Sequence, residues 1–133
     1  MTSLPSCPKI HFSSAPEISL RVRIAADPES RARGLMYQTR LDENEGLLLV
    51  FPQAVKQAIW MRNVVLPLSV ACVSRDGAVI DLLELEAMDE THHHPVAEYQ
   101  YIVEANAGWF LRHGVRIGDQ MTFDSGGGPI FVS

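Results

Sequence analysis

A tryptophan, an arginine and an asparagine lie close together within Ile59–Pro67, a stretch whose other members are apolar. In an extended strand alternate side chains share a face, so Trp60 and Arg62 would point the same way. Glu104 and Asn106 repeat this two-residue spacing in a second candidate strand. If the two strands are neighbours, Arg62 holds Glu104 while Trp60 and Asn106 frame a ligand. An indole beside an amide and a carboxylate suits sugars and other small polar molecules.

Arg33 is a rival partner for Glu104, because a guanidinium group makes planar two-point contacts with a carboxylate. The structural alternative is an ion pair between Arg62 and Glu104 that fixes strand register, with Trp60 in the core. The predicted ligand-binding set is Trp60, Arg62, Asn63, Glu104, Asn106 and Arg33.

Three consecutive histidines, His92, His93 and His94, form a candidate metal site. Imidazoles bind zinc, copper or nickel, and in an extended loop His92 and His94 point the same way. Asp89 and Glu90 are close enough in sequence to add a carboxylate. Three adjacent imidazoles cannot all converge without a strained turn, so a solvated loop is the favoured interpretation. No metal site and no cofactor is predicted.

Signals for catalysis are weak. There is no Gly-x-Ser-x-Gly element, phosphate loop or dinucleotide fingerprint, and neither cysteine has an activating context. Several acids could pair as general acid and base, namely Glu84, Glu86, Glu104 and Asp119. A binding module is therefore favoured over an enzyme, and no catalytic residue is predicted.

Composition limits the class of protein. A chain of 133 residues that is 47% apolar and 20% charged is typical of one soluble globular domain. The formal net charge of −5, with scattered basic residues, argues against nucleic acid as a partner. Apolar runs end well short of the roughly 20 residues that cross a bilayer, so no membrane insertion is expected. The segment Met1–Ile10 lacks the features of a secretion signal, which predicts a cytoplasmic location. Cys72 is expected to be buried and Cys7 exposed.

Alternation of apolar residues predicts a half-buried strand at residues 18–24, and an uninterrupted apolar run predicts one covered on both faces at 47–51. Asp27 and Pro28 suit the start of a short helix over residues 28–36. The other expected elements are strands at 10–12, 66–73, 78–85, 100–106 and 120–123, and a short helical piece at 107–113. Many short strands with one clear helix indicate a mainly β, α+β domain, a sandwich or a barrel. It is expected over residues 18–123, with a loosely ordered arm at 1–17 and a tail at 124–133.

Seven short motifs occur in a fixed order: Arg33-Gly34-Leu35-Met36, Gly46–Phe51, Trp60-Met61-Arg62-Asn63, Leu66-Pro67-Leu68, Asp76-Gly77, Val103–Gly108 and Ile117-Gly118-Asp119. Over about residues 18–123 the series closely resembles the bacterial and archaeal family called domain of unknown function one-nine-two, also named an uncharacterised ancient conserved region. The resemblance implies a compact, jelly-roll-like, mainly β fold and no particular reaction.

The sequence departs from that family at two positions. Relatives commonly have Lys where this chain has Arg62, and Asp where it has Ser69, which removes one candidate acid. Many relatives also carry an export signal or lipid anchor, and neither is recognisable here. We therefore predict a non-catalytic binding or accessory module for a small polar or carbohydrate-like ligand. The alternatives are a small metal-dependent or acid–base enzyme, using His92 or His94 with Glu104 or Asp119, and a protein-interaction domain with an exposed strand edge.

Overall fold

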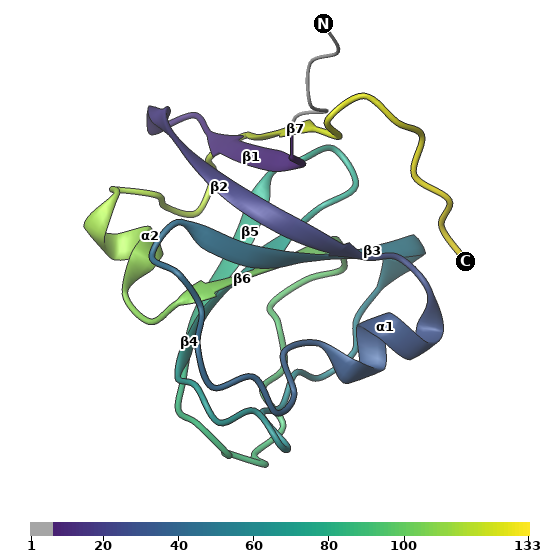
Figure 1. Ribbon diagram of the computed structural model, residues 1–133, viewed down its shortest axis with the longest axis vertical. Helices are drawn as coiled ribbons and strands as arrows, with labels where there is room; N and C mark the ends of the chain where they lie inside the picture. The colour runs from purple at the N-terminus through teal and green to yellow at the C-terminus, as the bar shows by residue number, and fades with distance from the viewer. Residues whose placement is uncertain (1–6) are drawn as a thin grey trace, which may run out of the picture.

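The computed structural model describes residues 7–133, which form one curled sheet and two short helices (Figure 1). The elements in chain order are β1 (Lys9–Phe12), β2 (Ala15–Ala25), α1 (Pro28–Arg33), β3 (Glu45–Val55), β4 (Leu68–Val73), β5 (Val79–Leu85), β6 (Tyr99–Asn106), α2 (Trp109–Arg112) and β7 (Met121–Asp124). All seven strands lie in the sheet in the order β5-β4-β6-β3-β2-β1-β7. The predicted mainly β class is confirmed.

The sheet curls so far that its two edge strands meet at one end. Ala78, just before β5, pairs in a bridge with Gln120, just before β7. The backbone N–H of Val79 also donates to the carbonyl of Asp119 at 2.9 Å. Neighbouring strands are antiparallel, apart from the parallel pair β2 and β3. A parallel pair needs a crossover connection, and here this connection carries α1.

Apolar side chains fill both sides of the central strands. The inner cluster contains residues from every strand and is closed by Trp109 and Phe110 of α2. The outer cluster holds alternate residues of the same central strands, such as Leu47 and Leu49 of β3, and lies under α1 and the long loops drawn below the sheet in Figure 1. Because both faces of β3 are covered, residues 47–51 are all apolar, as the sequence predicts.

Three expectations about local structure need correction. The stretch around Trp60 is not a strand, because only Ile59 makes a β-bridge, to His93, and the chain then turns at Arg62 and Asn63. The helix predicted to run to Met36 ends at Arg33, where Gly34 with φ 50° closes it. Within the arm expected at residues 1–17, the predicted strand at 10–12 is present as β1, but β2 begins at Ala15, three residues before the strand predicted at 18–24. The rest of that arm, residues 1–6, lies outside the described residues.

The remaining predictions concern the cysteines, the tail and the membrane. Cys72 is buried and Cys7 is exposed, as expected, and the two are not bonded to each other. The C-terminal segment runs beside the sheet, where Ile130 packs against the inner cluster and the N–H of Ser133 donates to the carbonyl of Ala26. Within residues 7–133, no helix is both long and apolar enough to cross a membrane.

Candidate functional site

A cavity of about 490 Å³ opens on the outer face of the sheet, between β3, β6, α1 and the segment of residues 57–64. Its size falls in the range of small-molecule sites, which is about 300–1,000 Å³. The floor is apolar, with Leu49, Phe51, Tyr99 and Ile102 among its residues. Its polar lining includes four of the residues predicted for ligand binding: Arg33, Trp60, Arg62 and Glu104.

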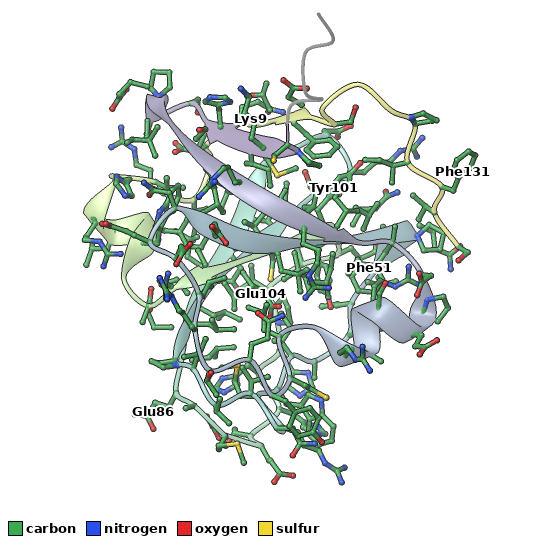
Figure 2. All side chains as sticks on the ribbon, in the orientation of Figure 1. Lys9, Phe51, Glu86, Tyr101, Glu104 and Phe131 are labelled. Atoms are coloured by element: carbon green, nitrogen blue, oxygen red, sulfur yellow. The ribbon has the colours of Figure 1, made fainter. Side chains whose placement is uncertain are left out.

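Glu104 lies on the sheet among apolar neighbours. Its register partners are Leu47 on β3 and Val70 on β6's other neighbour, β4. Only 9% of the residue is exposed. Figure 2 shows Glu104 on the side of β3 that faces α1, whereas Tyr101, which also belongs to β6, lies on the opposite side of β3. The sequence predicts this alternation, because residues 101 and 104 differ by an odd number.

The carboxyl group of Glu104 lacks the ion pair that the sequence suggests. Its Oε1 is buried and has no hydrogen-bond partner among residues 7–133. Neither Arg62 nor Arg33 forms a salt bridge with it in the described part of the chain, so both expected pairings are wrong. A Cβ added to Gly34 would lie 3.6 Å from this Oε1, so the glycine borders the carboxyl group without filling the space beside it.

Burial raises the pKa of Glu104 from its ordinary value of 4.5 to about 7, while the nearby Arg23 guanidinium acts in the opposite direction. The dominant cause is desolvation, because the ionised form has lost water and gained no donor. A buried acceptor without a partner costs about 1–3 kcal/mol of stability. Perturbed acids of this kind gather at functional sites, which makes Glu104 the principal candidate residue.

Arginines of α1 and of the facing segment line the same cavity as the acid, namely Arg31, Arg33 and Arg62. α1 is capped by Asp27, whose carboxylate accepts from the N–H of Ser30 at 2.8 Å, and Arg31 and Arg33 lie in its last turn. Arg31 donates to the carbonyl of Val50 at 3.0 Å and lies over the ring of Phe51, 5.1 Å from its centroid. Arg31 is therefore fixed in place, and Arg33 is exposed.

Trp60 and Arg62 contact each other although they do not lie on a strand. The guanidinium carbon of Arg62 lies 5.6 Å from the centroid of the Trp60 ring, a cation–π distance. The imidazole ring of His92 also packs edge-on against the Trp60 ring, with the two ring centroids 5.2 Å apart. Trp60 is 40% exposed, which places it at the rim of the cavity and not in the core.

The loop of residues 88–93 holds the segment that carries Trp60. The backbones of Ile59 and His93 exchange two hydrogen bonds, and the N–H of Met61 donates to the carbonyl of Asp89 at 2.8 Å. The N–H of Met88 in turn donates to the carbonyl of Val64. These backbone hydrogen bonds fix the position of the segment, as strand pairing does in the sheet.

Two non-glycine residues with left-handed backbone conformations lie next to residues that line the cavity, Tyr37 beside Met36 and Asn63 between Arg62 and Val64. Among residues 7–133, the non-glycine residues with positive φ are Tyr37, Asn63 and Met88, at 65°, 60° and 63°. The N–H of Tyr37 donates to the carbonyl of Asn63, so two of these strained turns support each other. Such conformations cost energy and persist where the surrounding structure enforces them.

Two residues of the predicted set lie elsewhere. Asn106 donates its side-chain amide to the carbonyls of Leu41 and Asp42, at 2.9 and 2.8 Å, and thereby anchors the loop that follows α1. Asn63 supplies the left-handed turn described above. Neither lines the cavity. Their binding role remains a prediction, and the structure gives each of them a clear structural task.

The histidines do not converge. His93 contacts the carboxylate of Asp89 at 3.1 Å, while His92 packs on Trp60 and His94 is exposed. Hydrogen bonds from Thr91, followed by His93, lower the pKa of Asp89. In the described range of the chain, no group of three His, Cys, Asp or Glu side chains is arranged to hold a metal ion.

Ser69 and Asp119, two other buried polar residues, have structural partners. Ser69 accepts from the N–H of Gly108 at 2.7 Å and donates to Glu84 at 2.5 Å, which ties β4 to the turn before α2. Asp119 accepts from the hydroxyl of Ser14 at 2.6 Å and does not line the cavity. Glu104 and Asp119 are therefore not an acid–base pair.

Sequence reasoning misses Arg31, Phe51, Tyr99 and Gln57, which also line the cavity. Tyr99 donates its hydroxyl to the carbonyl of Gln57 at 2.8 Å, and burial raises its pKa to about 12. No local pattern marks these residues. A usable signal was the order of the motifs, because the stretches around Gly34, Trp60 and Glu104 all meet at this cavity.

Comparisons with known proteins agree with this structure. A solved structure from Sinorhizobium meliloti 1021, named as that of a proposed transcription regulator, superposes with a TM-score of 0.80 at 25% identity, covering 92% of this chain and 98% of the other. One from Novosphingobium aromaticivorans, a protein of unknown function, gives 0.81 at 24% identity, covering 91% and 94%. No curated protein sequence matches the chain. The family model DUF192, described as Uncharacterized ACR, matches residues 10–123. The chain therefore belongs to the DUF192 family, as its ordered motifs suggest.

Proposed function

We propose that the chain is a binding module that takes a small organic ligand with a polar group into the cavity between α1, β3, β6 and residues 57–64. The observation that carries the proposal is the buried Oε1 of Glu104, which lacks a hydrogen-bond partner in the described chain and borders this cavity. A ligand hydroxyl or amine would supply the missing donor and would recover the cost of leaving the acceptor unsatisfied.

The shape of the cavity supports the same function. Phe51 and Tyr99 pack edge-to-face with centroids 5.7 Å apart, giving an apolar floor of fixed geometry. Trp60 at the rim offers an aromatic surface that is still accessible. An apolar floor with a small number of placed polar groups around it is typical of a small-molecule site.

Tryptophan fluorescence tests the proposal directly, because the chain has two tryptophans in opposite settings. Trp60 borders the cavity, whereas Trp109 is 0% exposed in the inner core and serves as an internal reference. Titration with a panel of neutral sugars, small organic acids and amines should change the emission of the wild type. In Trp60→Phe the emission change should disappear, while calorimetry should still detect binding if the rest of the site is intact.

The matched variants are Glu104→Leu, which removes the acceptor with little change in volume, and Glu86→Leu, which changes an exposed glutamate. Glu104→Leu should abolish binding and Glu86→Leu should not. Unaltered affinity in folded Glu104→Leu, or no response to any member of the panel, would refute the proposal.

A second candidate function is acid–base catalysis by Glu104, favoured by its pKa of about 7. A group with that pKa exchanges protons readily near neutral pH. The structure brings neither His92 nor Asp119 to the cavity, so Glu104 would act alone or with a group of the substrate. Turnover of a bound panel member, lost in Glu104→Gln while binding remains, would favour the enzyme.

A further inference from the structure

The charges around the cavity differ in sign from those of the chain as a whole. The chain carries a formal net charge of −5, yet the cavity is lined by three guanidinium groups and one carboxyl group, those of Arg31, Arg33, Arg62 and Glu104. Even with Glu104 ionised, the lining is cationic. A local excess of this kind attracts anions and raises their rate of association.

Two of the three arginines have N–H donors that are not used within the described chain, although the Arg62 guanidinium also contacts the Trp60 ring. Arg31 already donates to the Val50 carbonyl. Arg33 and Arg62 make no side-chain hydrogen bond or salt bridge with any residue in the range 7–133. Both are exposed at the cavity, one from the end of α1 and the other from the segment facing it. A carboxylate or phosphate between them would receive two-point hydrogen bonds from planar donors.

The acid is at a different depth from these arginines. Glu104 is buried on the sheet, whereas Arg33 and Arg62 are exposed, and the apolar surface of Phe51, Tyr99 and Ile102 completes the lining. A matching ligand is thus charged at its outer end, apolar in its middle and hydrogen-bonding at its inner end. Neutral sugars lack a charged end, and cations would be repelled by the two arginines.

We infer that the ligand is a small organic anion, a carboxylate or phosphate monoester with an apolar body, whose charged end binds Arg33 and Arg62 and whose far end donates a hydrogen bond to Glu104. This inference rests on the proposed function and narrows it to one charge class. The carboxylate and the phosphate share the same recognition chemistry, so separate arms of the test distinguish them.

A probe series of constant body and changing charge tests the inference. Its members are 4-hydroxyphenylpropionate, 4-hydroxyphenethyl phosphate, the neutral 4-ethylphenol and the cation tyramine, each titrated calorimetrically at low and high salt. At least one anion should bind about tenfold or more tightly than the neutral phenol, and tyramine most weakly. The advantage of the anion should shrink as salt screens the arginines. The preferred anion identifies the headgroup.

Variants locate the effect. In the double variant Arg33→Gln with Arg62→Gln, the anion should lose about tenfold or more in affinity while the neutral phenol changes little. Arg116→Gln, an exposed arginine that does not line the cavity, is the matched control and should leave both affinities unchanged. Phenylpropionate, which lacks the far hydroxyl, should bind to the wild type more weakly than 4-hydroxyphenylpropionate does.

The outcomes separate this inference from the proposed function. If the phenol or tyramine binds as tightly as both anions, and Glu104→Leu abolishes that binding, the anion inference is overturned while the binding site stands. Equal loss of anion affinity in Arg116→Gln and in the double variant would also overturn it. If no member of the series binds, both the inference and the proposed function fail.

Discussion

Replacing Glu104 by Gln should make the stability of the protein nearly independent of pH in a range where the wild type loses stability. The folded pKa of Glu104, about 7, lies above its ordinary value of 4.5. Between these values the native state keeps a proton that the unfolded chain has released. The stabilisation from this proton is complete below pH 4.5 and is lost as pH rises through about 7.

The magnitude follows from the same two values. At about 1.4 kcal/mol per pH unit, a rise from 4.5 to about 7 is equivalent to about 3 kcal/mol of unfolding free energy. The loss in the wild type should reach about 1 kcal/mol at pH 5, about 2 kcal/mol at pH 6 and about 3 kcal/mol at pH 8. Glutamine has a similar shape and no proton to lose, so the difference between Glu104→Gln and wild type should grow by these amounts.

Denaturant unfolding of both proteins between pH 4.5 and 8 measures this difference. Glu86→Gln reports what the loss of one exposed carboxylate does to the same curve. A difference between Glu104→Gln and wild type that stays constant from pH 5 to pH 8 would refute the reasoning, because it would mean that the carboxyl group is hydrated or paired in solution. A maximum in the difference within this range would point to a second titrating partner.

Three further predictions concern the frame around the site. Gly46→Ala should destabilise the protein by about 2 kcal/mol or more in denaturant unfolding, because the added Cβ would lie 2.3 Å from the backbone oxygen of Glu104. Gly128→Ala is the control, because a Cβ added there would meet nothing within 4 Å. Ser69→Ala should cost about 1–3 kcal/mol, since the N–H of Gly108 loses its 2.7 Å acceptor and keeps only the longer 3.3 Å contact with Glu84, and an unchanged unfolding free energy would contradict this. A thiol reagent should label one cysteine per native chain and two after unfolding, because Cys72 is buried and burial raises its pKa to about 12; two fast-reacting thiols in the native protein would disprove it.

The sheet was largely predictable because burial leaves a periodic record in its strands. Residues 18–24 alternate since only some positions of β2 are covered, and residues 47–51 are all apolar since both faces of β3 are. The curl of the sheet was less accessible. The bridge between Ala78 and Gln120 joins residues 42 positions apart, and no local pattern encodes such a contact.

The stretch around Trp60 shows where periodicity misleads. Its apolar residues Ile59, Met61 and Val64 are buried in the outer cluster, which gives the segment the composition of a strand. Its hydrogen bonds go to the loop of residues 88–93. Asn63 adopts a left-handed backbone conformation, which asparagine tolerates but which its presence in a sequence does not predict. The prediction that Trp60 and Arg62 lie together was nevertheless useful, since they meet through a cation–π contact.

For the candidate site, the sequence predicts which residues take part better than it predicts which of them contact each other. Glu104 and Arg62 do line one cavity, but the ion pair expected between them is absent from the described chain. Pairing depends on depth within the fold, and sequence spacing carries no information about depth. The unpaired state of Glu104, on which the proposed function depends, was therefore visible only in three dimensions.

The parallel pairing of β2 and β3 has a consequence for how this fold can diversify. The crossover of residues 26–44 has to travel from one end of the sheet to the other, and it carries α1 and hence one wall of the cavity. The opposite wall is another long connection, residues 56–67, between β3 and β4. Both walls can exchange side chains, lengthen or shorten while the hydrogen-bonded strands keep their register. A mutant library restricted to these two connections should therefore yield folded proteins with new binding preferences and an unaltered seven-stranded sheet.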